Sequence, residues 1–155
     1  MKHEAATPET DPAEYVREVT ARYIGPRRKS IVISHSGVAA EFMRRLLRDH
    51  AREHFIALYL SGSHRIVSYS IVSIGTANTA PVHPREVFQG AFLAGACALI
   101  VGHNHPSGDL EPSHADLLFT ARLKDAATLL GISLLDHVIL SGDSYFSLRD
   151  RGLFD

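Results

Sequence analysis

Two histidines separated by one residue are the side chains of this sequence that are best placed to bind a metal ion. His103 and His105 follow the apolar run of residues 97–102, which is typical of a strand buried on both faces. Alternate side chains of an extended chain lie on the same face, so both imidazoles can reach one ion. The pair alone leaves open a second interpretation, in which two loop histidines form ordinary hydrogen bonds.

A carboxylate in the following helix is the third candidate ligand. Asp116 precedes Phe119 by three residues and Leu123 by seven, so it shares the apolar face of the helix expected over residues 113–130. A carboxylate directed at a core is costly unless a positive charge meets it. The local alternative is a capping box, with Ser113 as N-cap and Asp116 as third helical residue. With the two histidines nearby we favour a shared cation, because three protein ligands and one water form a catalytic zinc site.

Metal-assisted hydrolysis also needs a group that accepts a proton from water and delivers it to the leaving group. Glu53 begins the first predicted strand, where a buried sheet can hold it over the metal, and is our preferred general base. Glu86 is the alternative, although the dipole of its helix is enough to explain an acid in the first turn. Ser113 can donate its hydroxyl to an oxyanion, and it can also serve only as the helix cap.

The elements that position these residues follow from the hydrophobic periodicity of the chain. Helices are expected over residues 14–23, 37–51, 83–96 and 113–130, with Ser36 as the N-cap of the second. Strands are expected over residues 54–60, 65–74, 97–102, 132–140 and 145–148. This mixture predicts an α/β fold, in which helices pack against a mixed sheet.

Length and composition narrow the class of protein. The chain has 155 residues, 45% of them hydrophobic, which predicts one domain over residues 13–155 after a flexible tail of residues 1–12. The formal net charge of −1 argues against a generally basic nucleic-acid-binding protein. Residues 15–52, the basic segment, carry nine Lys and Arg against three acids. That excess predicts either a solvated helical face or an acidic partner such as DNA.

The remaining cysteine and histidines have simpler interpretations. Cys97 is the one cysteine, which excludes disulfides and zinc sites built on paired thiolates, and we expect it in the core. His137 is expected to be buried and hydrogen bonded, with metal ligation as the alternative, and His54 and His114 are expected to lie at the surface. The longest apolar run, residues 91–101, is too short to cross a bilayer, and the polar start of the chain does not resemble a signal peptide. We therefore expect a cytoplasmic protein that is not attached to a membrane.

This set of residues resembles the JAMM/MPN metalloproteases, and more closely the bacterial RadC family. The shared pattern is His103-x-His105, Ser113 after seven further residues and Asp116 after two more, together with an upstream Glu that Glu53 matches. Over about residues 30–155, further RadC-like segments are His83-Pro84-Arg85-Glu86, His103-Asn104-His105-Pro106-Ser107-Gly108-Asp109, Pro112-Ser113 and Leu135-Asp136-His137. Several fixed intervals agree at once, which makes the resemblance specific.

The resemblance implies a cytidine-deaminase-like α/β/α sandwich with zinc held by His103, His105, Asp116 and a water. It implies hydrolysis of a peptide or isopeptide bond, with Glu53 as the general base and Ser113 stabilising the oxyanion. RadC proteins carry a DNA-repair name, but the resemblance identifies no substrate. Longer RadC proteins begin with a helix-hairpin-helix region suited to DNA, and we expect none in this chain. The alternative function is a non-catalytic interaction or DNA-associated module of the same fold.

Overall fold

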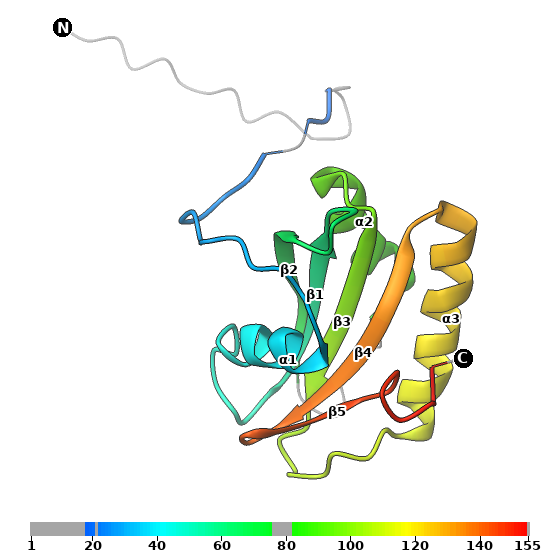
Figure 1. Cartoon of the computed structure of the whole chain (residues 1–155). Helices are drawn as coiled ribbons and strands as arrows, with labels where there is room; N and C mark the ends of the chain where they lie inside the picture. The colour runs from blue at the N-terminus through cyan, green and yellow to red at the C-terminus, as the bar shows by residue number, and fades with distance from the viewer. Residues whose placement is uncertain (1–17, 21, 76–81, 155) are drawn as a thin grey trace, which may run out of the picture.

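A computed structural model describes residues 18–20, 22–75 and 82–154 of the chain (Figure 1). The predicted tail of residues 1–12 lies outside these ranges. The strands of the described residues are β1 (Glu53–Leu60), β2 (Ile66–Gly75), β3 (Ala98–Asn104), β4 (Ser133–Ser141) and β5 (Ser144–Ser147). The helices of the same residues are α1 (Ser36–Arg44), α2 (Pro84–Ala94) and α3 (His114–Leu130). None of these helices is long and apolar enough to span a bilayer.

The strands form one mixed sheet in the order β2-β1-β3-β4-β5. β3 and β4 are parallel and are connected through α3, whereas every other neighbouring pair is antiparallel. Because β1 and β3 run in opposite directions, Phe55 near the start of β1 is paired with His103 near the end of β3. The candidate base at the start of β1 and the two candidate histidine ligands at the end of β3 therefore lie at the same end of the sheet.

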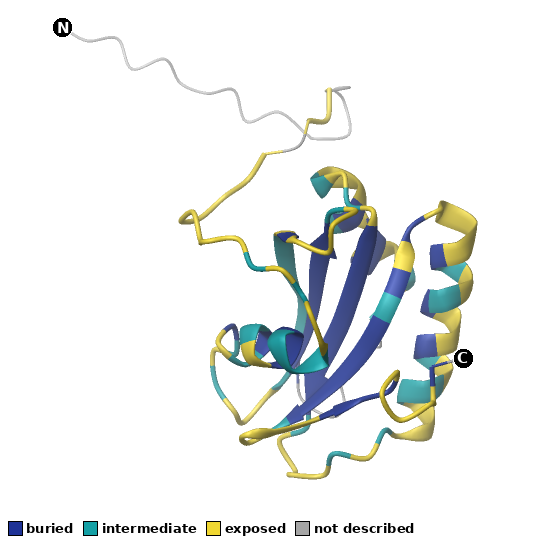
Figure 2. Ribbon diagram, viewed as in Figure 1, coloured by how far each residue is buried: buried dark blue, intermediate teal, exposed yellow. Residues whose placement is uncertain are grey.

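Helices cover both faces of the sheet, so the fold is the α/β sandwich that the sequence predicts (Figure 1). α1 packs on one face, where Met43 belongs to a buried cluster with Ile100 and Val138. α2 and α3 pack on the other face, where Phe88 and Leu123 belong to a second buried cluster. Figure 2 shows the central strands as a continuous buried layer between them. This double coverage explains why the central strands are continuously apolar in sequence.

A glycine in β3 lets α1 approach the sheet closely. A Cβ atom on Gly102 would lie 2.4 Å from Met43 Sδ and 2.9 Å from the backbone oxygen of Val138. The methionine side chain can move aside, but the backbone of β4 cannot, so any side chain at this position would disturb the packing. Gly102 directly precedes His103, and it thereby helps to fix the end of β3 that carries the candidate ligands.

The predicted helix over residues 14–23 was wrong where the structure describes it. Residues 18–20 and 22–23 are not helical, and the other residues of that segment lie outside the described ranges. Val19 and Tyr23 are 87% and 70% exposed, so these two apolar side chains, among the described residues of the segment, give a helix no buried face. The other predicted elements, apart from the helix over residues 37–51, begin and end within two residues of the observed ones.

The predicted helix over residues 37–51 was too long, and its cap was misplaced. α1 ends at Arg44, and Asp49 accepts hydrogen bonds of 3.0 and 2.9 Å from the backbone N–H groups two and three residues later. Such bonds between side chain and backbone favour a turn over a continued helix. The N-cap is His35, whose Nδ1 accepts a hydrogen bond from the backbone two residues later, and Ser36 is the first helical residue.

Two predictions about single residues were also wrong. Cys97 is exposed instead of lying in the core, because β3 begins at the next residue. His54 is fully buried instead of lying at the surface, because its ring is bonded to the turn that follows α1. Its Nδ1 lies 2.9 Å from the Arg52 carbonyl oxygen, and its Nε2 accepts a hydrogen bond of 3.3 Å from the Arg48 N–H. His114 is exposed, as predicted.

Candidate metal centre

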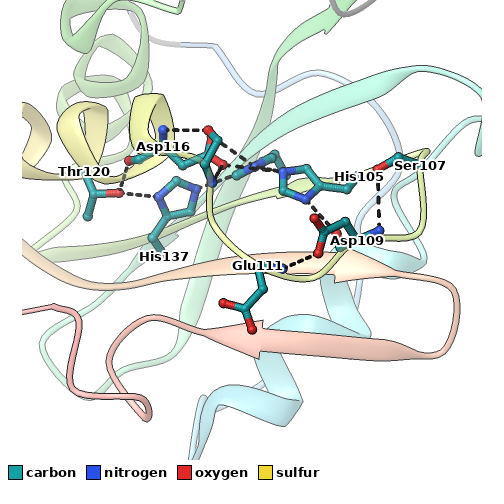
Figure 3. Close-up of polar contacts among 9 residues, drawn as sticks. His105, Ser107, Asp109, Glu111, Asp116, Thr120 and His137 are labelled. Atoms are coloured by element: carbon teal, nitrogen blue, oxygen red, sulfur yellow. Dashed lines mark hydrogen bonds and ion pairs between the residues drawn. The ribbon is translucent and has the colours of Figure 1, made fainter.

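The three predicted ligands meet where β3 ends and α3 begins. His103 lies in β3, which extends two residues beyond its predicted end, His105 follows the strand, and Asp116 lies in the first turn of α3. One ligand atom from each residue lies within 4.8 Å of the other two. Figure 3 shows the side chains of His105 and Asp116 directed toward each other. Within the described part of the chain, no other group of three or more such side chains could hold a metal ion.

The separations between these ligand atoms fit a tetrahedral zinc ion. His103 Nε2 lies 2.9 Å from His105 Nε2 and 3.4 Å from Asp116 Oδ1, and His105 Nε2 lies 3.5 Å from Asp116 Oδ2. Bonds of about 2.0–2.1 Å at tetrahedral angles place neighbouring ligand atoms about 3.3 Å apart. Two imidazoles and one carboxylate leave a fourth position for water, as in catalytic zinc sites.

Asp116 also caps the helix that carries it. Its Oδ2 accepts a hydrogen bond of 2.8 Å from the Ser113 N–H, and Ser113 Oγ accepts one of 3.1 Å from the Asp116 N–H. The capping box and the position facing both histidines, which the sequence analysis treated as alternatives, therefore coexist. The cap orients the carboxylate and does not use the hydroxyl hydrogen of Ser113, whose side chain is exposed.

The loop after β3 orients His105. The Nδ1 atom of His105 lies 2.7 Å from the backbone oxygen of Asp109. A carbonyl oxygen only accepts, so Nδ1 carries the hydrogen and Nε2 is left to face Asp116. The loop folds back through a turn in which the Gly108 N–H donates to the His105 carbonyl at 3.1 Å. Gly108 has a φ of +92°, which only glycine adopts without strain.

The carboxylate and the two imidazoles shift each other's pKa values. Burial raises the pKa of Asp116, but the contacts of its carboxylate with the His103 and His105 rings outweigh burial and hold this pKa well below its usual range. The pKa of His105 is raised, mainly by its hydrogen bond to Asp116, with smaller contributions from the Asp109 carbonyl and the charge of Glu53. Near neutral pH the centre therefore contains the Asp116 carboxylate as an anion, which attracts a cation.

The two candidate bases lie in different environments. Glu53 is half-buried at the start of β1, on the same sheet face as Phe55, whose ring stacks on His103 with 6.1 Å between centroids. Its charge contributes to the raised pKa of His105. Glu86 is exposed, and its carboxylate accepts a hydrogen bond of 2.7 Å from the backbone N–H of the residue that precedes α2. The structure gives Glu86 a capping role and leaves Glu53 beside the centre.

Comparison with known proteins agrees with this arrangement. Residues 33–153 match the family model described as the RadC-like JAB domain. The chain belongs to this family. Its relatives include UPF0758 proteins of Chlorobium chlorochromatii (43% identical over 121 residues, 78% of this chain and 54% of that protein), Shouchella clausii (43% over 123 residues, 79% and 54%) and Methanosarcina acetivorans (43% over 127 residues, 82% and 54%). The chain spans about half the length of these relatives.

Membership of the RadC-like JAB domain family confirms the resemblance found in the sequence. JAB domains are typically metal-dependent, in agreement with a group of His103, His105 and Asp116 that could bind a metal ion. The names of the relatives state no activity.

Asn104, which was not a candidate site residue in the sequence analysis, holds the backbone next to the centre of this RadC-like JAB domain. Asn104 lies between the two histidines and is buried, with its side chain bonded to β1. Its Nδ2 donates a hydrogen bond of 3.0 Å to the Arg52 carbonyl, and its Oδ1 accepts one of 2.7 Å from the His54 N–H. These bonds hold the backbone on both sides of Glu53. An amide at the end of an apolar strand is a signal that could have found it, because buried polar groups need partners.

His137 is buried and hydrogen bonded, as predicted. Its Nε2 lies 2.8 Å from His103 Nδ1, and its Nδ1 lies 2.6 Å from Thr120 Oγ1. Burial holds the pKa of His137 well below its ordinary value, so the ring is neutral near neutral pH. Thr120 was not a candidate in the sequence analysis. Its spacing of four residues from Asp116 could have found it, because residues four apart share a helix face.

Proposed function

We propose that this RadC-like JAB domain is a zinc-dependent hydrolase that cleaves a peptide or isopeptide bond. The observation that carries the proposal is the convergence of His103 Nε2, His105 Nε2 and the Asp116 carboxylate at separations suited to one tetrahedral ion. In this proposal these three side chains hold the zinc. Zinc bound there supplies Lewis acidity, which polarises a substrate carbonyl and lowers the pKa of water.

Glu53 is the proposed general base. Support comes from its position at the end of the sheet that carries the ligands and from its contribution to the raised pKa of His105. Its carboxylate would accept a proton from the attacking water and return it to the departing amine. Glu86 is the alternative base, but its carboxylate already accepts the hydrogen bond at the start of α2.

Ser113 is the proposed donor to the oxyanion. Its Oγ accepts the capping hydrogen bond from the Asp116 N–H, so the hydroxyl hydrogen can be donated to a substrate. A donor aimed at a developing negative charge lowers the barrier because it stabilises the transition state more than the ground state. The cap and the donor role use different parts of the same hydroxyl group.

Metal analysis followed by substitution tests this proposal. Protein purified without chelator should contain near-stoichiometric zinc, and His103→Ala or His105→Ala should lose it. Absence of bound metal from the wild type would overturn the proposal. Glu53→Gln should keep zinc but lose hydrolysis of a library of fluorogenic peptides and isopeptides, whereas the matched control Glu86→Gln should keep both. Full activity of Glu53→Gln would assign the base to another residue.

A non-catalytic interaction or DNA-associated module is the alternative function. The positive charge of the basic segment favours it. However, Arg44, Arg45 and Arg52 are paired with Glu41 or Asp49, which reduces the charge that they offer to DNA. Salt-dependent binding of a DNA duplex by a protein that hydrolyses none of the peptides would favour the module over the enzyme.

The proposed cellular setting is the cytoplasm, and a link to DNA repair is proposed from the DNA-repair name of the RadC family. An exposed free thiol at Cys97 is compatible with a reducing compartment. Cell fractionation with an antibody to the native protein tests the location. Recovery of the protein in the secreted fraction would contradict it.

A further inference from the structure

We propose that His137 is a positioning residue that fixes the tautomer of His103, and that Thr120 fixes the tautomer of His137 in turn. The inference rests on the proposed metal function, because its consequence is the direction in which the His103 lone pair points. It gives a role to a buried histidine and a buried threonine that lie behind the metal ligands.

A chain of contacts runs from the Asp116 backbone in α3 through Thr120 and His137 to His103. The direction of each hydrogen bond follows from the Asp116 end of this chain of contacts. The backbone oxygen of Asp116 lies 2.7 Å from Thr120 Oγ1 and can only accept, so the threonine hydroxyl donates to it. Because its one hydrogen is used, Thr120 Oγ1 must accept from His137 Nδ1, 2.6 Å away. His137 therefore carries its hydrogen on Nδ1. Figure 3 shows this ring nitrogen directed at Thr120.

The other end of the chain of contacts reaches a metal ligand. The His137 ring is fully buried, and among the described residues its nitrogens contact the Thr120 hydroxyl and the His103 ring, with no carboxylate paired to a second ring hydrogen, so its Nε2 has a lone pair. His103 Nδ1 lies 2.8 Å from that atom and must donate to it. The hydrogen of His103 is thus on Nδ1, and its Nε2 lone pair faces His105 and the Asp116 carboxylate.

Asp116 takes part at both ends of this chain of contacts. Asp116 anchors Thr120 through its backbone oxygen and faces His103 Nε2 through its carboxylate, at 3.4 Å. Phe55 stacks on the His103 ring with an interplanar angle of 11° and meets the His137 ring edge-on, at 71°. Both imidazoles are therefore held by packing as well as by hydrogen bonds, and four elements (β1, β3, β4 and α3) together fix one ligand nitrogen.

Packing alone does not explain a histidine at position 137. A buried polar ring costs free energy unless all of its nitrogens are bonded, and an apolar ring would fill the same space without that cost. What the histidine adds is an acceptor for the Nδ1 hydrogen of a ligand imidazole. Removing such a partner from a metal-bound histidine typically weakens metal binding by about 10–100-fold.

Zinc affinity, measured by competition with a chromogenic chelator, tests the inference in matched variants. His137→Phe should weaken zinc binding by about 10–100-fold, and Thr120→Val should weaken it by less. Thr120→Ser keeps the hydroxyl and should bind zinc as the wild type does. His54→Phe removes an equally buried histidine outside these contacts and should also leave zinc affinity unchanged. A His137→Phe protein that binds zinc as tightly as the wild type would overturn the inference.

Nitrogen NMR of wild-type protein with isotope-labelled histidine tests the inference without any variant. His103 and His137 should both carry hydrogen on Nδ1 in the metal-free protein, and His103 should keep it when zinc is added. A His103 ring with hydrogen on Nε2 and none on Nδ1 would refute the inference, even if every variant fails to fold. Wild-type protein that shows the expected tautomers but takes up no zinc would refute the proposed function and support the hydrogen-bond assignment.

Discussion

Asn104→Ala removes the side chain that joins β1 to β3 beside the candidate metal centre. The native Oδ1 accepts a hydrogen bond of 2.7 Å from the His54 N–H, and Nδ2 donates one of 3.0 Å to the Arg52 carbonyl. That carbonyl keeps a second contact, His54 Nδ1 at 2.9 Å, so the lost bond costs about 1 kcal/mol. The His54 N–H is left buried without an acceptor, which costs about 1–3 kcal/mol more.

We therefore expect the free energy of unfolding to fall by about 2–4 kcal/mol, or the melting temperature by about 5–15 °C for a chain of this length. Urea and thermal unfolding followed by circular dichroism measure both quantities. The control His114→Ala, at an exposed residue of α3, should change the free energy of unfolding by less than about 0.5 kcal/mol. Equal stability of the Asn104→Ala and His114→Ala proteins would refute the reasoning.

The same substitution separates zinc binding from the positioning of Glu53. The three candidate ligands remain in Asn104→Ala, whereas the backbone on both sides of Glu53 loses its attachment to β3. We expect peptide hydrolysis to fall more than zinc affinity. Loss of zinc with hydrolysis unchanged per bound zinc would contradict this expectation.

Three further predictions address the pH dependence, the packing and the cap of the centre. The pKa of His105 is raised in the folded protein, so its ring keeps a proton to higher pH than in the unfolded chain, and zinc must displace that proton. Zinc affinity, measured by chelator competition, should therefore fall by about tenfold per pH unit below this pKa and level off above it. Gly102→Ala should lower the free energy of unfolding by about 1–3 kcal/mol in urea titrations, because its Cβ would meet the β4 backbone. Gly62→Ala, whose Cβ meets nothing closer than 4.0 Å, should be nearly neutral, and equal effects would contradict the packing argument. Ser113→Ala removes the helix cap and should lower the free energy of unfolding by about 1 kcal/mol in urea titrations. It should also reduce hydrolysis while zinc is retained. Unchanged hydrolysis per bound zinc would leave Ser113 only its capping role.

The helix and the strand that carry the ligands could be predicted because their determinants are local. Ser113 caps the start of α3, and Gly131 ends it in a left-handed conformation with φ of +68°. The apolar run before His103 is visible in sequence because both faces of β3 are covered. The spacing of His103, His105 and Asp116 then follows from where the strand ends and the helix begins.

The sequence predictions failed where the outcome depends on contacts with other parts of the chain. The helix of residues 37–51 was extended too far because its apolar pattern continues past the point where Asp49 bonds the backbone as a turn. His54 was placed at the surface because nothing in its own neighbourhood shows that the turn after α1 covers it. A helix over residues 14–23 was expected from local pattern, but the described residues of that segment are exposed and give a helix no buried face.

The sequence by itself determined that two imidazoles and a carboxylate belong to one strand end and one helix start, because strand alternation and helix capping act between near neighbours. Only the tertiary structure decided that β1 lies antiparallel beside β3, which brings Glu53 to the ligands, and that β4 places His137 behind His103. Strand order and register are set by how helices on both faces bury side chains from distant segments. No local pattern carries that information.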